Sequence, residues 1–314
     1  MRGRLQRLEN LVDLRESDLL PAVVVKELWQ GLRRIGFVVP FLIIHLVSAL
    51  LVSIELLYQG SGQLSWLATQ LDIEAFAPFW MFTVLVIGIV MPGMGVVLMR
   101  QELDHGNHEL LQLTTLTRWR IILGKWSAVW MLSLLTLSSL LPYFLIRYFR
   151  GGVDVGENVG LLLFVVCLSS VVTSLALAIS VFKPLAKQIG VGILFGMSTL
   201  ISGSIPLLVT AGHFASPSTY TLISGFINLA CTTAGLTLLA LLCARSRLKL
   251  KSHQFEVSAS SIGIVIYFFL PLVVGLGTVV TLGQLGGLSV LAPAGFLYLV
   301  DLKDDQPDKA YANL

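Results

Sequence analysis

The amino-acid sequence predicts an all-α, polytopic integral membrane protein. Its 314 residues are 55% hydrophobic and only 12% charged, whereas about a quarter of a soluble domain is normally charged. Residues 188–244 contain no Lys, Arg, Asp or Glu. Such runs cross lipid as helices, because the strands of a membrane barrel are about ten residues of alternating polarity. The composition predicts that the lipid bilayer is a partner of the protein. It excludes two classes, the nucleic-acid-binding proteins and the disordered chains.

We expect six core transmembrane helices and two further C-terminal ones, since a crossing helix needs about 20 mostly apolar residues. Gly212 and Ser216–Ser218 divide the uncharged run at 188–244, and Gly283–Gly287 divides a second run at 257–300. The expected segments are 35–54, 77–99, 121–146, 159–182, 188–211, 220–243, 262–282 and 288–300. The last segment is either a full span or a re-entrant hairpin.

The basic residues predict the orientation. With the N-terminus inside, every Lys and Arg except Arg147 and Arg150 lies in an inner segment, as the positive-inside rule requires. We therefore expect a multi-pass protein of the bacterial plasma (inner) membrane with both termini cytoplasmic. Residues 1–34 form the cytosolic N-terminus, residues 35–300 the transmembrane domain, and residues 301–314 a cytosolic tail.

The segment before the first span has the pattern of an amphipathic helix. Asp18 suits an N-cap and Pro21 a first helical turn. Apolar and polar side chains recur mostly on opposite faces: Val25, Leu28, Trp29 and Leu32 against Lys26, Gln30, Arg33 and Arg34. This pattern is typical of a helix lying in the inner interface. The alternative is an ordinary basic anchor beside the membrane.

The polar stretch Arg100–Trp126 between the second and third spans predicts a short cytosolic helix. Gly106 breaks the preceding helix, Asn107 can cap a new one, and Glu109 lies in its first turn, where a negative charge is favourable. The leucines at 110, 111 and 113 give it an apolar surface suited to a groove on a partner protein. Arg118, Arg120 and Lys125 are expected to follow as a belt at the inner leaflet.

This stretch resembles the corresponding loop of type-2 ABC-transporter permeases, the membrane subunits of ATP-binding-cassette exporters. Their pattern Gly-Thr-x-Glu-x-Leu-x-x-Thr-Pro-x-Ser-Arg, followed by Gly-Lys, is matched at Gly106, Glu109, Leu111, Thr114, Arg118, Gly124 and Lys125. Asn107, Thr115 and Thr117 replace the usual Thr, Pro and Ser. Lys26, Glu27 and Leu28 are similar to the family's elbow helix, so the resemblance covers roughly the first 125 residues.

The resemblance implies that the chain is a permease driven by a separate nucleotide-binding ATPase subunit. A coupling helix would then rest on that subunit, formed within the loop 100–120 by Glu102, Gly106, Asn107, Glu109, Leu110, Leu111, Thr114 and Arg118. The elbow helix would contain Lys26, Glu27, Leu28, Trp29, Arg33 and Arg34. ATP and Mg²⁺ would bind the partner, since this chain has no phosphate-binding loop motif. A second copy or a homologous permease would complete a dimer, and this chain would be neither an enzyme nor the holder of a cofactor or metal.

Two other function classes remain as alternatives. An ion- or proton-coupled secondary transporter is disfavoured because the spans contain few charged residues and no evident inverted repeat. Its candidate groups are His45 and Glu55 in the first span. A membrane-embedded enzyme is disfavoured because Gly196-Met197-Ser198 lacks the small residue expected after a serine nucleophile. Its histidine candidate, His213, falls in a loop in this interpretation.

The remaining candidates for chemistry are isolated. His105 and His108 have metal-ligand spacing, but only Asp104 offers a third ligand, so we interpret them as solvated loop residues. Cys167, Cys231 and Cys243 have no paired spacing and are expected to be small membrane-core side chains. Nothing in the sequence names a substrate: lipids, hydrophobic peptides, drugs and glycans all fit it.

Overall fold

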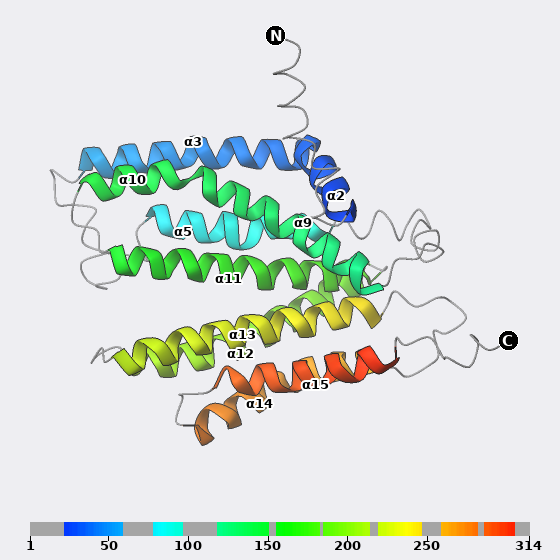
Figure 1. Ribbon diagram of the computed structural model, residues 1–314. Helices are drawn as coiled ribbons and strands as arrows, with labels where there is room; N and C mark the ends of the chain where they lie inside the picture. The colour runs from blue at the N-terminus through cyan, green and yellow to red at the C-terminus, as the bar shows by residue number, and fades with distance from the viewer. Residues whose placement is uncertain are drawn as a thin grey trace, which may run out of the picture. The chain divides into compact units, whose positions relative to one another are not determined.

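The computed structural model describes residues 22–58, 78–96, 118–150, 155–182, 185–213, 219–246, 259–281 and 286–304. Regular structure within these ranges is entirely helical, which confirms the all-α class (Figure 1). The helices belong to two compact units. One comprises Met1–Met94 and Trp119–Leu162, and the other comprises Gly95–Arg118 and Leu163–Leu314.

Four described helical stretches are long and apolar enough to cross a membrane: Ile35–Ile54, Trp119–Phe149, Asn158–Ser180 and Ile223–Arg245. Shorter apolar helical stretches are Pro78–Gly93, Gln188–Ser204, Val265–Val280 and Leu288–Val300. Each coincides with one of the apolar segments expected from the sequence. The structure is therefore that of an all-α protein with the helices of a membrane protein.

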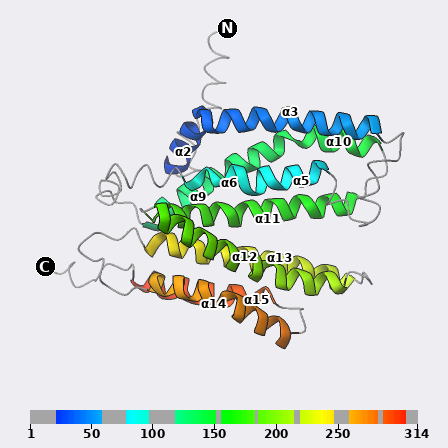
Figure 2. The same ribbon diagram turned by 180° about the vertical axis from the view of Figure 1, so that it is seen from behind.

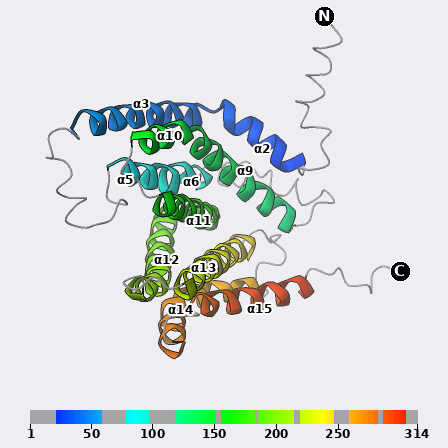
Figure 3. The same cartoon turned by 60° about the vertical axis from the view of Figure 1, so that its left-hand side comes forward.

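The first unit begins with α2 (Ala22–Arg33), which leads through the non-helical Arg34 into α3 (Ile35–Tyr58). Figure 3 shows α2 turning away from the axis of α3 at this point. The second apolar segment consists of α5 (Pro78–Leu85), the π-helix η2 (Val86–Val90) and α6 (Met91–Gly93). The third consists of α9 (Arg118–Ser139) and α10 (Leu141–Arg150). Helix α3 packs against α5 and α10.

An aromatic cluster holds one end of this unit together. The Phe79 ring meets Phe144 edge-on at 5.1 Å between centroids, and the Arg147 guanidinium lies 4.9 Å from the Phe79 centroid. Trp80 Nε1 donates a hydrogen bond of 3.0 Å to Asn158 Oδ1, at the start of α11 (Val155–Ser180). The third segment breaks at Leu140 next to Pro142, which has no N–H to continue the helical ladder.

The second unit contains α11 from Leu163, α12 (Leu185–His213), α13 (Thr219–Ser246), α14 (Ala259–Val280) and α15 (Leu288–Asp304). Helix α13 packs along α15, and α12 along α14 (Figure 2). Buried hydroxyl groups join these helices as well: Ser170 Oγ lies 3.3 Å from Thr237 Oγ1, between α11 and α13.

Two glycines let the C-terminal helix α15 approach its neighbours closely. A Cβ atom on Gly235 of α13 would lie 2.8 Å from the Val290 carbonyl carbon and 2.9 Å from the Leu291 nitrogen. A Cβ atom on Gly277 of α14 would lie 2.5 Å from Ser289 Cβ. At these two positions only glycine leaves enough room for α15. Small residues permit the same close approach of helices in membrane proteins.

We predict that Gly235→Ala destabilises the protein. A glycine-to-alanine change inside a helix normally stabilises it by about 0.5–1 kcal/mol. At Gly235 the new methyl group must displace backbone atoms of α15, an overpacking that costs about 1–3 kcal/mol. Thermal unfolding of the purified protein in detergent measures the effect. Gly275→Ala in α14 is the control, because a Cβ there meets nothing within 4 Å. Equal unfolding midpoints for the two variants would contradict the packing argument.

Candidate functional site

Helix α2 buries one face against the rest of the first unit. Val24, Val25, Glu27 and Gly31 are buried and recur at helical spacing, whereas Trp29 and Leu32 on another side are exposed. The buried face thus includes a carboxylate among apolar residues. Because a buried charge is unfavourable unless it is paired, the partner of Glu27 determines what this face contacts.

That partner is Lys125, near the start of α9. Lys125 Nζ donates a hydrogen bond of 3.2 Å to Glu27 Oε1, and the exposed fractions of the two side chains are only 2% and 5%. Little solvent screens the attraction between such buried charges. The pair therefore fixes α2 onto the first turns of α9, the helix that follows the loop between the second and third segments.

A second contact lies about one turn farther along α2. A Cβ atom on Gly31 would come within 2.6 Å of Leu132 Cδ1, so the α2 backbone lies directly against the α9 side chains there. Exposed residues of α2 face outward beside this contact: the Arg33 guanidinium lies 5.2 Å from the centroid of the Trp29 ring. The arrangement combines a docked inner face with a Trp and Arg surface of the kind found at membrane interfaces.

The structure corrects the assignment of Lys125 to a belt at the inner leaflet. Arg120 is exposed as a belt residue would be, but Lys125 is buried in the ion pair. The positive-inside rule predicts on which side of the membrane a basic residue lies. It does not predict which side chain that residue contacts. A signal was present nonetheless, because Glu27 falls on the same helical stripe as Val24 and Gly31.

The second segment has an irregular backbone shortly before the loop. The N–H of Met91 bonds to the carbonyl of Val86, five residues earlier, which closes the π-helix η2. Pro92 follows and contributes no N–H to the ladder. Single π-turns inside α-helices are frequent at functional positions. The segment leading into the loop can therefore bend more easily here than a regular helix.

The sequence-predicted site residues divide into two groups. Those of the elbow helix lie on α2 or just after it: Lys26 and Arg33 are exposed, and Leu28 and Arg34 are half-buried. Arg118 is the first residue of α9. The other predicted coupling residues lie outside the described residues: Glu102, Gly106, Asn107, Glu109, Leu110, Leu111 and Thr114.

His45 makes structural hydrogen bonds. Its Nε2 lies 3.0 Å from Ser139 Oγ, while that hydroxyl donates to the Thr136 carbonyl at 2.6 Å. Since the hydroxyl has one proton, its oxygen accepts from the histidine, and Nε2 carries a hydrogen. Tyr143 adds a hydrogen bond from its hydroxyl to the His45 carbonyl at 3.3 Å. His45 therefore joins α3 to the junction of α9 and α10.

The candidates for catalysis are likewise structural where they are described. Ser198 Oγ is buried and donates its proton to the Tyr267 carbonyl at 2.7 Å. The three cysteines are free thiols. Within the described ranges no three His, Cys, Asp or Glu side chains gather as metal ligands. His105, His108 and Asp104 lie outside these ranges.

Comparison with known proteins gives no family assignment: no family model, curated protein or solved structure matches the chain.

We predict that breaking the ion pair costs more than replacing it. Glu27→Gln leaves the Lys125 ammonium buried without the carboxylate, a change that typically costs about 3–5 kcal/mol. The double variant Glu27→Leu, Lys125→Met removes both charges and should recover most of that loss. Unfolding midpoints in detergent measure both effects, with the exposed Lys26→Gln as control. The single variants Glu27→Leu and Lys125→Met complete a double-mutant cycle, and strictly additive losses in it would show that the two charges do not stabilise each other.

Proposed function

We propose that the chain is the membrane-spanning permease subunit of an ATP-binding-cassette transporter, working as an exporter. The proposal rests on the residues that resemble the family's loop, Gly106, Glu109, Leu111, Thr114 and Arg118, and on the Gly-Lys pair that follows them. In this proposal the chain crosses the membrane with six core helices and two more, and both termini are cytoplasmic.

The observation that carries the proposal is the Glu27–Lys125 ion pair. Glu27 belongs to the run that resembles an elbow helix, and Lys125 closes the run that resembles the coupling loop. These positions are 98 residues apart in the sequence, yet they meet in one buried contact. The contact explains why a Glu at position 27 and a Lys at position 125 would both be needed. It also links the proposed interfacial helix α2 to the first turns of α9.

The link suggests how motion would pass through the subunit. ATP binding would close the nucleotide-binding subunits and push the coupling helix. Because α9 directly follows the loop, its first turns would move with it, and the ion pair would carry α2 along. The π-helix η2 would let the second segment bend. ATP would then bias an equilibrium between inward-open and outward-open arrangements through its different affinity for the two.

The proposal assigns the chemistry to partners. ATP and Mg²⁺ would be held by a separate ATPase subunit, and this chain would be a transducer rather than an enzyme. A second copy of the chain or a homologous permease would supply the other half of the pathway, as closed symmetric pairing is the common arrangement of such subunits. The bacterial plasma membrane is the proposed location.

We predict that Glu109→Arg disrupts the contact with the ATPase partner that supports ATP hydrolysis. Reversing this charge would place a positive group at the positive end of the proposed coupling helix and opposite the basic surface proposed to receive Glu109. The test isolates the tagged chain with its associated ATPase and measures vanadate-sensitive ATP hydrolysis, which we expect to fall about tenfold while chain abundance stays near normal. Asp308→Arg in the C-terminal tail is the matched charge-reversal control. Absence of any associated ATPase, or unchanged hydrolysis in the Glu109 variant, would refute the proposal.

We predict opposite labelling of two loops. In a background without the native cysteines, a cysteine replacing Gly62 should react with a membrane-impermeant maleimide added to intact cells. A cysteine replacing Ser252 should react only after the cells are opened, because the basic residues near it face the cytoplasm. Mass spectrometry or a gel shift reads the labelling, and the reverse pattern would invert the proposed topology.

A further inference from the structure

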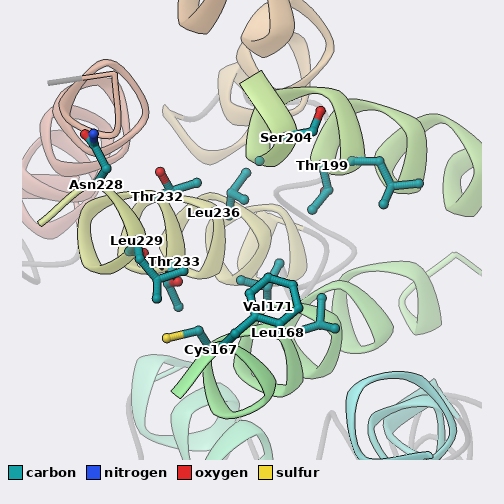
Figure 4. Close-up of a pocket in the computed structure, with 13 residues that line it drawn as sticks. Cys167, Leu168, Val171, Thr199, Ser204, Asn228, Leu229, Thr232, Thr233 and Leu236 are labelled. Atoms are coloured by element: carbon teal, nitrogen blue, oxygen red, sulfur yellow. Dashed lines mark hydrogen bonds between the residues drawn. The ribbon is translucent and has the colours of Figure 1, made fainter. Parts of the chain in front are cut away.

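A pocket of about 210 Å³ lies within the second unit. Its wall comes from α11, α12 and α13, and Figure 4 shows side chains of these three helices around it. The lining extends from Phe164 to Val171 on α11 and from Asn228 to Leu236 on α13. At 1.5 Å of rise per residue, this lining extends about 10–12 Å along the helices.

Three of the four hydroxyl groups around the pocket are already engaged within the protein. Thr199, Ser204 and Thr233 each hydrogen-bond to a carbonyl of their own helix, at 2.7, 3.1 and 2.7 Å. Thr199 Oγ1 also lies 2.6 Å from the Tyr267 hydroxyl. Because these hydroxyl groups already have partners, a polar ligand would gain few hydrogen bonds from them. It would still lose its hydrogen bonds to water, so polar ligands are disfavoured.

The two remaining polar side chains turn toward α15. Asn228 Oδ1 accepts a hydrogen bond of 3.1 Å from the N–H of Gly287, in the turn before α15. Thr232 Oγ1 is buried without a hydrogen-bond partner among the described residues, and it lies 3.0 Å from where a Cβ on Gly287 would be. Figure 4 shows both polar ends on the side of α13 away from α11. The surface that faces the pocket is therefore mostly apolar and includes groups such as Phe164, Leu168 and Leu236.

The size and depth of the pocket narrow the ligand class. An enclosed apolar cavity of about 150 Å³ is large enough to bind benzene, and this pocket, which is partly open to its surroundings, is larger. Its α11 and α13 walls lie within Asn158–Ser180 and Ile223–Arg245, two helices able to cross a membrane. Flexible hydrocarbon chains are the abundant apolar groups inside a bilayer, and a lining that extends about 10–12 Å along the helices is long enough for a segment of such a chain.

We propose that this pocket binds a hydrocarbon chain, the acyl tail of a bilayer phospholipid or of a single-chain amphiphile. The inference rests on the membrane location of α11 and α13 and does not depend on an ATPase partner. Where the chain acts as an exporter, the pocket makes an acyl-bearing amphiphile the substrate class with a place to bind.

Photochemical labelling tests the proposal. The full-length chain is placed in lipid nanodiscs containing a phosphatidylcholine with a diazirine in its acyl chain, or plain phosphatidylcholine with a diazirine fatty acid. After irradiation, mass spectrometry locates the adducts. We expect the adducts on the peptides of α11, α12 and α13 that line the pocket. Adducts from both probes would show that the acyl chain of either molecule enters the pocket. Adducts from one probe alone would show whether the chain comes from a phospholipid or from a single-chain amphiphile.

A filling variant and a matched control make the test specific. Gly203 lines the pocket, and a Cβ there meets nothing within 4 Å, so Gly203→Leu should fill the space without strain. Gly196→Leu is the control, because it lies two turns earlier on α12, is equally unobstructed and does not line the pocket. We expect adducts on the pocket peptides to fall at least fivefold in the filled variant and to stay within twofold in the control.

Ser204→Phe provides a second filling variant if Gly203→Leu does not elute as a single folded species. The proposal would be overturned if the pocket peptides carried no more adducts than the other peptides of the chain. It would also be overturned if the filling variants left the number of adducts on the pocket peptides unchanged. That failure would leave the ATPase partnership untouched, since vanadate-sensitive hydrolysis is measured separately and without the probes.

Discussion

The first unit depends on one buried electrostatic contact, the ion pair between Glu27 and Lys125. Separating α2 from α9 would leave two charges in apolar surroundings or require water to reach them, and either is unfavourable by several kcal/mol. The two helices therefore behave as one body unless an external force supplies that energy. This constraint connects an N-terminal helix lying outside the apolar segments to the segment that follows the polar loop.

The same requirement explains several polar side chains that connect the apolar helices. His45 is bonded to Ser139, Ser198 to the Tyr267 carbonyl, and Asn228 to the N–H of Gly287. Each of these contacts joins two helices that are separated in the sequence. Without water nearby, a polar group with no internal partner would cost free energy, so these hydrogen bonds connect helices and satisfy the polar groups at the same time.

Hydropathy alone located the apolar helices, because the length and composition of a lipid-crossing helix are narrowly limited. The same reasoning missed the contacts. Lys125 was assigned by its charge to the inner surface, and only the fold shows that Glu27 reaches it. The π-helix Val86–Val90 has no sequence signature apart from the nearby Pro92. The importance of Gly235 depends on which helix lies opposite, and that is a property of tertiary structure.

The glycine contacts of α15 also bear on how such a chain could be shortened or extended. Gly235 in α13 leaves a notch filled by the backbone at Val290 and Leu291. In a version of the chain that ends before α14, the surface of α13 at Gly235 would lose its packing contact with the α15 backbone. Helices α14 and α15 are therefore an integral part of the second unit, since they pack along α12 and α13.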